Sequence, residues 1–507
     1  MSRSSGVLLA VTSLPSMFGV GDLGPAARTW VDRLAAGGQT WWQVLPVGPF
    51  GAGDSPYASF STFAGETLLI SPEDLVADGL LEAADLAGPA FADGTADFDR
   101  ARPFREGLLA RAWERFRTGA APALRGEFDA FVVREREWLE DWALYAALKA
   151  AHGGASWETW PEELRLRARG AVRRAEKELA VARDEHRFRQ FLWHRQWAAL
   201  RRHAAARGVK LLGDMPIFVA EDSCDAWATP GVFRFGPGRR PAEVAGVPPD
   251  YFSADGQLWG NPVYDWKAQA RSGFAWWVRR ARHAARMFDL VRLDHFRGYA
   301  AAWHIPAGAK TAREGRWVPG PGMALFGAIR TALGGLPFVA EDLGLITRDV
   351  RELRAAAGLP GMRVLQFAFD GDPDNTFLPH NIDRDSVVYT GTHDNDTSVG
   401  WWAGLGAPER QRAGAYLRTD GHDIAWDLIR MAWSTVADLA LAPLQDVLML
   451  GPEGRMNVPG VPSRNWRWRV LPEAPVEDRL AGLCELSRLY ARLPRGAGQI
   501  PGKGPAG

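Results

Sequence analysis

The sequence predicts an α/β protein built on a (β/α)8 TIM barrel, with large helical and loop insertions and no C-terminal β-sandwich domain. Two observations carry this prediction. Eight short apolar segments each end in polar or charged residues, and most of them are separated by stretches compatible with a helix. The segments are residues 7–11, 41–47, 209–217, 288–294, 338–342, 362–369, 386–392 and 439–445.

The individual elements follow from local patterns. Residues 7–11 form an apolar run that is too short for the apolar core of a signal peptide and is typical of a buried strand. Before the third segment, Phe188, Phe191 and Leu200 recur at helical spacing among Arg, His and Gln residues. Gly208 then ends that predicted helix, and the third strand follows.

The uneven spacing of the segments predicts two insertions within one catalytic domain that spans residues 1–507. The second and third segments lie much further apart than one βα unit requires, and the charged, Ala-rich sequence between them predicts a helical insertion over residues 66–186. Its charge runs are expected to be solvated helix faces. Residues 221–270 are rich in Gly and Pro and predict a loop-rich insertion, in which Tyr251 and Phe252 belong either to a lid over the cleft or to a loop packed on its rim.

The composition narrows the possible function classes. The 60 basic and 60 acidic side chains give a formal net charge of zero, which argues against a general nucleic-acid binder. No run of about 18 apolar residues is present, so no membrane span is expected. Two cysteines, Cys224 and Cys484, cannot by themselves build a disulfide framework or a thiolate zinc site. We therefore expect a cytoplasmic enzyme.

In a barrel of this type, the active site lies at the carboxyl ends of the strands. The fourth segment ends in Arg292, Leu293 and Asp294. Arg292 and Asp294 are two positions apart and so point to the same side of the strand, and a carboxylate beside a guanidinium stays ionised, as a nucleophile should. From this segment alone, a structural Arg–Asp pair that closes the barrel fits equally well.

Carboxyl groups also end the fifth and seventh segments. Glu341 follows an apolar strand, a setting that raises a carboxyl pKa and keeps a proton available near neutral pH. The alternative there is a helix N-cap or turn role, which suits the adjacent Asp342 better. Residues 392–397, Thr-His-Asp-Asn-Asp-Thr, form a polar cluster that packs poorly and so favours a functional site, although one of its aspartates is expected to cap a helix.

Carboxylates at the ends of three strands, together with an Arg and a His, suit glycosidic chemistry. That chemistry needs an ionised nucleophile, a protonated acid and groups that hold ring hydroxyls as oxocarbenium character develops. A divalent metal site uses the same residue types. However, His393 and Asp394 lack the spaced His pairs of a zinc site, and the Arg beside Asp294 opposes a cation. We therefore expect no metal and no cofactor.

Motifs along almost the whole chain are similar to those of one family. They include Thr12-Ser13-Leu14-Pro15, Ser55-Pro56-Tyr57, Gly213-Asp214-Met215-Pro216, Arg292-Leu293-Asp294-His295-Phe296-Arg297-Gly298, Ala340-Glu341-Asp342-Leu343-Gly344, Gly391-Thr392-His393-Asp394-Asn395 and Arg455-Met456-Asn457-Val458-Pro459-Gly460. In this order they strongly resemble the amylomaltases, also called 4-α-glucanotransferases or disproportionating enzymes, a branch of the α-amylase superfamily. Little resemblance is seen in the helical insertion.

The resemblance implies a role for each matching residue. Asp294 is expected to be the nucleophile, Glu341 the general acid/base, and Asp394 a third carboxylate that holds hydroxyls of the distorted donor sugar. Substrate contacts are implied for Tyr57, Asp214, Arg292, His393, Gln257, Trp259, Asn465, Tyr251 and Phe252. Among these, Tyr57 is expected to stack beneath the donor sugar.

The expected activity is transfer of α-1,4-glucan segments between maltooligosaccharides or starch chains, by a retaining double displacement through a covalent glycosyl-enzyme. An α-amylase-type hydrolase shares the barrel and the carboxylates, but usually carries a β-sandwich for which the roughly 60 residues after the eighth segment are too few. A non-catalytic glucan-binding barrel would be expected to have lost a carboxylate, yet all three are present. We expect a monomer or weak homodimer that binds neither nucleic acid nor membranes.

Overall fold

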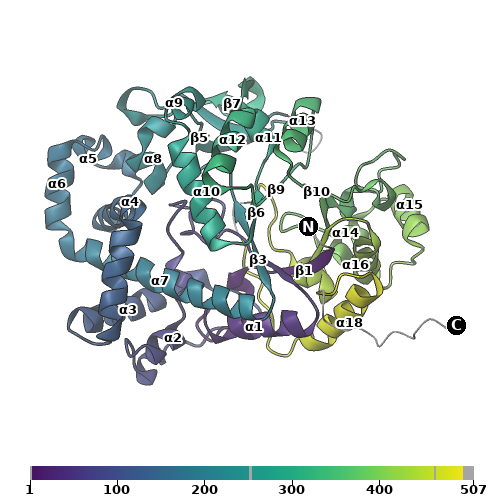
Figure 1. Ribbon diagram of the computed structural model, residues 1–507, viewed down its shortest axis with the longest axis horizontal. Coiled ribbons are helices and arrows are strands. Elements are labelled where there is room, and N and C mark those ends of the chain that lie inside the picture. The colour runs from purple at the N-terminus through teal and green to yellow at the C-terminus, as the bar shows by residue number, and fades with distance from the viewer. Residues whose placement is uncertain (1–2, 250–253, 462–463, 495–507) are drawn as a thin grey trace.

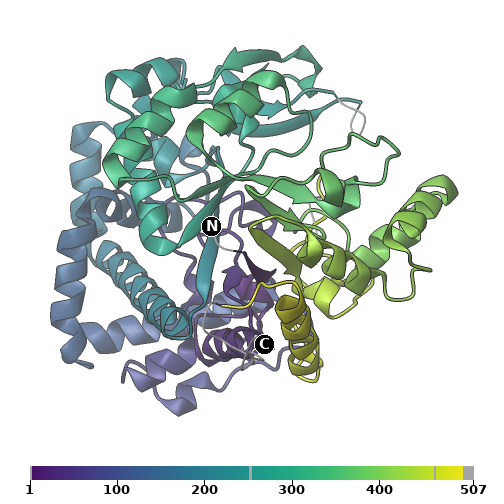
Figure 2. The same cartoon turned by 45° about the vertical axis from the view of Figure 1, so that its right-hand side comes forward.

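A closed barrel of eight parallel strands lies at the centre of the computed structural model, which describes residues 3–249, 254–461 and 464–494 (Figures 1 and 2). In chain order the barrel strands are β1 (Ser4–Leu8), β2 (Trp41–Gln43), β3 (Lys210–Met215), β6 (Leu290–Leu293), β9 (Phe338–Ala340), β10 (Gly361–Val364), β11 (Ser386–Tyr389) and β12 (Leu439–Pro443). Around the barrel they follow the order β1-β12-β11-β10-β9-β6-β3-β2. Each predicted segment overlaps one of these strands, so the predicted barrel is confirmed.

Apolar side chains from most of the strands fill the interior of the barrel. The buried cluster consists of Trp41, Leu212, Leu290, Val339, Met362, Val364, Val387, Tyr389, Leu439 and Leu441. On β1, Gly6 lies where a Cβ would come within 2.2 Å of the carbonyl oxygen of Trp41. Only glycine therefore allows β1 and β2 to approach as closely as they do.

Helices surround the barrel and follow most of its strands. They are α1 (Pro25–Ala36), α8 (Cys224–Ala228), α9 (Trp266–Arg271), α10 (Ala275–Met287), α11 (Arg297–Ala300), α12 (Gly322–Leu333), α13 (Arg348–Ala357), α14 (Ser398–Gly404), α15 (Ala407–Leu417), α16 (Ile424–Ser434), α17 (Leu444–Val447) and α18 (Val476–Leu489). The described chain after β12 contains α17 and α18 and no strand, which confirms the expected lack of a C-terminal β-sandwich in that part.

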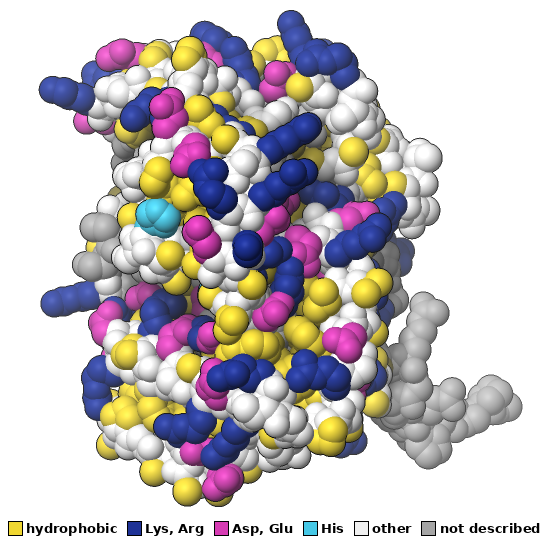
Figure 3. Space-filling model, turned by 90° about the vertical axis from the view of Figure 1, so that its left-hand side faces the viewer, with side chains coloured by type: hydrophobic (Ala, Val, Ile, Leu, Met, Phe, Trp, Pro, Cys, Tyr) yellow, Lys and Arg dark blue, Asp and Glu magenta, His cyan; other side chains and the backbone are white. Residues whose placement is uncertain are grey.

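The segment between β2 and β3 is helical. Its helices are α2 (Pro72–Ala77), α3 (Phe98–Arg117), α4 (Ala123–Ala151), α5 (Glu162–Arg165), α6 (Arg169–Glu178) and α7 (Ala180–Ala206), and α3 to α6 lie on one side of the barrel (Figure 1). The insertion boundary proposed at residue 186 falls inside α7, because the helix that precedes β3 continues without a break from the insertion. Figure 3 shows this side of the molecule, where basic and acidic side chains are intermixed. One ion pair of these helices joins Arg174, on α6, to Glu163, on α5.

A buried arginine ties the insertion to the loops of the barrel. Arg105, on α3, donates hydrogen bonds to the carbonyl oxygens of Phe18 (3.3 Å), Leu68 (2.8 Å) and Ile70 (3.1 Å). It also forms an ion pair with Asp22 at 3.0 Å, and both side chains are almost fully buried. One guanidinium group thus satisfies carbonyl acceptors from two separate loops and also pairs with the carboxylate of Asp22.

We expect Arg105→Met to destabilise the protein by about 3–5 kcal/mol, because the substitution leaves the Asp22 carboxylate and several carbonyl groups buried without a donor. Equilibrium urea unfolding would measure the change. Arg100→Met is the matched control, since Arg100 lies on the same helix but is 55% exposed and pairs with Asp97 at the surface; its expected cost is below about 1 kcal/mol. Equal small losses in the two variants would contradict the proposed anchoring role of Arg105.

A second sheet lies beside the barrel, and the sequence patterns did not predict it. Its strands are β4 (Glu243–Val247), β5 (Gln257–Pro262), β7 (Ala301–Pro306) and β8 (Arg316–Pro319), arranged antiparallel in the order β5-β4-β7-β8. The segment 221–270, predicted to be loop-rich, therefore supplies β4 and β5. These two strands pair with each other, and β4 also pairs with β7, which comes after β6 in the chain. The residues of the predicted lid, Tyr251 and Phe252, lie outside the described residues.

Candidate active site

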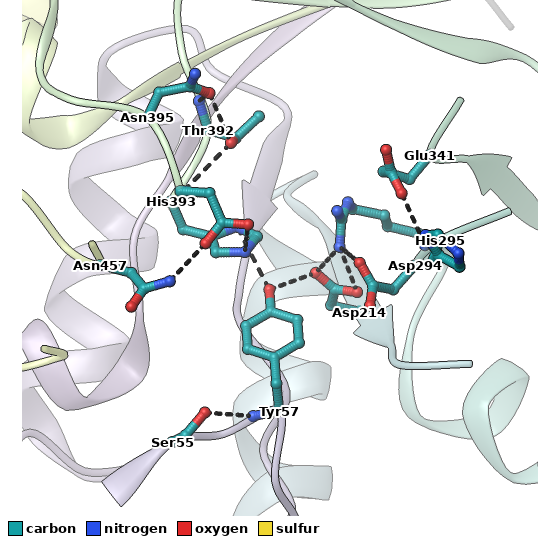
Figure 4. Close-up of polar contacts among 12 residues, drawn as sticks. Ser55, Tyr57, Asp214, Asp294, His295, Glu341, Thr392, His393, Asn395 and Asn457 are labelled. Carbon is teal, nitrogen blue, oxygen red and sulfur yellow. Dashed lines mark hydrogen bonds and ion pairs between the residues drawn. The ribbon is translucent and has the colours of Figure 1, made fainter. Parts of the chain in front are cut away.

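The predicted site residues gather at the carboxyl ends of the barrel strands (Figure 4). Asp214 lies near the end of β3 and Arg292 near the end of β6, while Asp294 and Glu341 directly follow β6 and β9. His393 and Asp394 follow β11, and Tyr57 lies in the loop after β2. Residues separated by more than 300 positions are thereby brought into one cluster by the closure of the barrel.

Arg292 is the charged centre of the cluster. Its Nη1 donates to both carboxylate oxygens of Asp214, at 3.0 and 2.8 Å, and lies 2.9 Å from Oδ1 of Asp294. The side chains of Arg292 and Asp214 are buried, whereas that of Asp294 is 27% exposed. Burial alone would lower the pKa of Arg292, but the charges of Asp214 and Asp294 outweigh it and hold this pKa well above its usual value. The guanidinium thus stays charged, and Asp294 beside it remains partly exposed to solvent.

Glu341 is held by backbone donors on both of its oxygens. The N–H of His295 donates to Oε2 at 2.7 Å, and the N–H of Leu343 donates to Oε1 at 2.9 Å. Burial raises the pKa of Glu341 to about 8; the negative charge of Asp294 adds to this effect, while Arg292 and the two N–H donors oppose it. Near neutral pH this carboxyl group therefore retains a proton that it can donate.

His295, whose N–H donates to Glu341, has an unusual backbone conformation. Its φ angle is +47°, in the left-handed region that non-glycine residues seldom occupy. This conformation turns the chain at His295, the residue whose N–H donates to Glu341. Strained backbone of this kind is concentrated at functional sites. His295 was not predicted as a site residue, because the φ angle of a histidine cannot be inferred from its residue type.

Tyr57 connects the acidic cluster to the segment after β11. Burial raises the pKa of its hydroxyl well above the usual value, so the group stays protonated and donates to Oδ2 of Asp214 at 2.9 Å. Its ring stacks on the ring of His393 with centroids 4.9 Å apart, and Trp466 packs against both rings at 5.8 and 6.0 Å. Trp466 was not predicted as a site residue.

Asp394 is held by two neighbours at the other end of the cluster. Nδ2 of Asn457 donates to Oδ1 of Asp394 at 2.6 Å, and Nε2 of His393 lies 3.4 Å from Oδ2. Partial burial would raise the pKa of Asp394, but His393, the hydrogen bond from Asn457 and the charge of Arg292 outweigh it and lower this pKa below its usual value. Asp394 is 47% exposed and presents an ionised carboxylate to the cleft.

The remaining predicted contacts lie at the margin of this cluster. Trp259, on β5, packs edge-to-face against His295 at 4.9 Å and donates through Nε1 to Gln257 at 3.0 Å. Asn465 bonds within its own loop: its side chain accepts from the N–H of Val458 and donates to the carbonyl of Val461. Gln257 and Trp259 are thus near the acidic cluster, whereas the contacts of Asn465 close the loop that carries Trp466.

The carboxyl groups of the site raise the question of whether they could bind a metal ion. Among residues 3–249, 254–461 and 464–494, no group of three or more His, Cys, Asp or Glu side chains is arranged to hold a metal ion. Four carboxyl groups lie in this cluster, and the guanidinium of Arg292 is in contact with two of them, those of Asp214 and Asp294. Within the same described residues, no helix is long and apolar enough to cross a membrane.

Known proteins resemble this chain in sequence and in fold. A family model described as 4-alpha-glucanotransferase matches residues 9–473. The 4-alpha-glucanotransferase of Thermus thermophilus is 49% identical over 97% of this chain and 100% of its own length, and that of Synechocystis sp. is 46% identical over 97% and 98%. A solved amylomaltase from Streptococcus agalactiae, in complex with acarbose, superposes with a TM-score of 0.94 at 34% identity, covering 97% of this chain and 100% of its own. The chain therefore belongs to the family of the 4-alpha-glucanotransferases, enzymes that transfer glucan segments.

Proposed function

We propose that this protein transfers α-1,4-glucan segments by a retaining double displacement, with Asp294 as nucleophile and Glu341 as general acid/base. One observation carries the assignment of roles. Asp294 is ion-paired with Arg292 at 2.9 Å, whereas burial raises the pKa of neighbouring Glu341 to about 8, so that Glu341 holds a proton near neutral pH. A retaining glycosidase-type reaction needs this difference, because one group must attack and the other must donate a proton.

In the first half-reaction, a carboxylate oxygen of Asp294 attacks the anomeric carbon of the donor. The glycosidic C–O bond breaks, and Glu341 transfers its proton to the departing 4-oxygen. A β-linked glycosyl ester on Asp294 results. In the second half-reaction, the 4-hydroxyl of an acceptor glucan attacks the same carbon, Glu341 takes its proton, and the ester bond breaks to restore an α-1,4 linkage.

The other residues are proposed to bind and orient the sugar. Asp394 and His393 hold ring hydroxyls of the donor, and these contacts strengthen as the ring distorts towards the oxocarbenium ion. Arg292 holds Asp294 in place through their ion pair, and Asp214 fixes Arg292. Tyr57 stacks beneath the donor sugar, supported by the ring stacking behind it. The remaining proposed contacts are Gln257, Trp259, Asn465, Tyr251 and Phe252.

Transfer rather than hydrolysis requires that a glucan reaches the ester before water does. We propose that Trp259, which is 37% exposed and packs against His295, favours a stacking sugar over water, and we propose the same role for Tyr251 and Phe252 if their segment forms the lid rather than a rim loop. Incubation with maltotriose tests the function directly. A ladder of longer glucans with glucose, at a constant number of reducing ends, is the expected result, whereas rising reducing ends without longer products would identify a hydrolase.

The raised pKa of Glu341 predicts the alkaline side of the pH profile. Below pH 8 the carboxyl group holds the proton that it must donate, and above pH 8 it loses that proton, so kcat/KM should fall about tenfold for each further pH unit. Initial rates between pH 5 and pH 10 at constant ionic strength would measure this. A profile that stays flat well above pH 8 would contradict the assignment of Glu341 as the acid.

We also propose a reducing, cytoplasmic location and a monomer or weak homodimer. Both cysteines are free thiols, and Cys224 is buried. Burial raises the pKa of the Cys224 thiol well above its usual value, which makes the group unreactive. Cell fractionation and light scattering of the purified protein would test the location and the oligomeric state, respectively.

A further inference from the structure

The loop after β12 contacts the predicted sugar-binding residues at two points. Asn457 donates to the carboxylate of Asp394, as described above, and Trp466 packs against Tyr57 and His393. A backbone hydrogen bond of 2.7 Å from the N–H of Trp466 to the carbonyl of Met456 closes the loop at its base. One closed loop therefore touches both the carboxylate and the aromatic stack of the site.

Arg455 fastens this loop to the segment that carries Asp394. Its Nε donates to the carbonyl of Asn457 at 2.8 Å, and its Nη2 donates to the main-chain carbonyl of Asp394 at 3.0 Å. Its Nη1 lies 3.7 Å from the carboxylate of Asp396. The guanidinium thus joins the backbone of Asn457 to the backbone of Asp394 and fixes the spacing between them.

We propose that Asn457 is a positioning residue, which sets the rotamer of Asp394 so that its carboxylate meets the ring hydroxyls of the distorted donor sugar. This inference rests on the proposed role of Asp394. The 2.6 Å hydrogen bond engages Oδ1, while His393 faces Oδ2, so both oxygens are oriented before substrate arrives. A charge-assisted hydrogen bond of this length is among the stronger side-chain contacts.

The position of Asn457 suits positioning better than a purely structural role. Asp394 is 47% exposed, so without a partner its carboxylate would be free to turn into solvent. Orienting such a group in advance lowers the reorganisation needed in the transition state, where its contacts with the sugar matter most. The effect of losing Asn457 should therefore appear in kcat more than in KM.

Asn457→Leu keeps the approximate size of the side chain and removes the donor. We expect kcat for maltotriose disproportionation to fall about 10- to 100-fold with little change in KM, the loss associated with one hydrogen bond to a charged group. Without this donor, the carboxylate form of Asp394 is less stabilised, so the pKa of Asp394 should rise towards its usual value. His393, Tyr57 and Arg292 also face Asp394 and are unchanged, so any shift reports the lost contact.

Asn381→Leu is the matched control, because the side chain of Asn381 also donates to backbone carbonyls in a loop, those of Pro373 and Asn375, away from the acidic cluster. It should leave kcat and the pH profile unchanged. Asn457→Asp, which replaces the donor by a like charge, should lower kcat at least as far as Asn457→Leu, and it provides a second variant if the first does not fold.

Wild-type kinetics in either Asn457 variant, with the protein folded, would overturn the positioning role. This outcome is distinguishable from failure of the proposed function itself. If Asp394→Asn is inactive and wild-type protein forms longer glucans, the proposed function stands whatever Asn457 does. If wild-type protein forms no longer glucans, the proposed function fails first.

Discussion

Replacing Asp294 with Asn is expected to lower kcat on the order of 10⁴-fold, because the amide cannot form the glycosyl ester. Arg292 keeps its contacts with Asp214 in this variant, so the barrel end should remain assembled. Disproportionation of maltotriose, followed by chromatography of the products, would measure the loss. Asp385→Asn is the control, since Asp385 is exposed and immediately precedes β11 at the opposite end of the barrel.

A second measurement identifies the nucleophile without relying on loss of activity. Wild-type protein mixed with an α-glycosyl fluoride donor and little acceptor should accumulate a covalent sugar, which mass spectrometry would locate on the peptide that contains Asp294. A folded Asp294→Asn variant that retains several per cent of the wild-type kcat, or a sugar attached elsewhere, would show that another residue attacks.

Glu341→Gln should lower the rate on natural glucans by roughly 10²- to 10⁴-fold, the usual contribution of general acid–base catalysis. The amide oxygen can still accept from one of the two N–H groups, that of His295 or that of Leu343, so the side chain keeps one of its two backbone contacts. Fluoride leaves without protonation, and an α-glycosyl fluoride should therefore restore the first half-reaction. The second half-reaction still lacks its base, so the glycosyl ester on Asp294 should accumulate.

This variant separates the role of Glu341 from a structural one. If Glu341 served only to hold the loop after β9, the fluoride donor would react no faster than a natural glucan in the variant. The alkaline limb near pH 8 should also disappear from the pH profile, because the group that titrates there has been removed. Retention of both the limb and the rate on natural glucans would assign the proton transfer to a different group.

The barrel and the positions of its acidic residues were predictable because they depend on local patterns. A strand buried on both faces requires a continuous apolar run, and the residue that ends it must lie at the barrel end. Arg292 and Asp294 share one side because side chains alternate along a strand, although the contact of Arg292 with Asp214, almost 80 positions away, requires the closed barrel.

The second sheet and the supporting contacts were not predictable in this way. β4 and β5 are short and contain Gly246 and Gly260, and the sheet is completed only by the pairing of β4 with β7 from beyond β6, so no local periodicity marks it. The contact of Asn457 with Asp394 joins two loops that follow different strands. Its motif was visible in the sequence, but only the spatial arrangement shows which side chain the asparagine meets.

The closure of the barrel between β1 and β12 has a consequence for synthesis of the chain. Ser4 bonds to Asp438, which is 434 positions away, so one edge of β1 stays unpaired until almost the whole polypeptide has left the ribosome. At ordinary translation rates this interval is roughly 20–90 s. Throughout that time an apolar strand edge is available to other nascent chains. Productive folding in the cell therefore depends on shielding the first strand until the last one arrives.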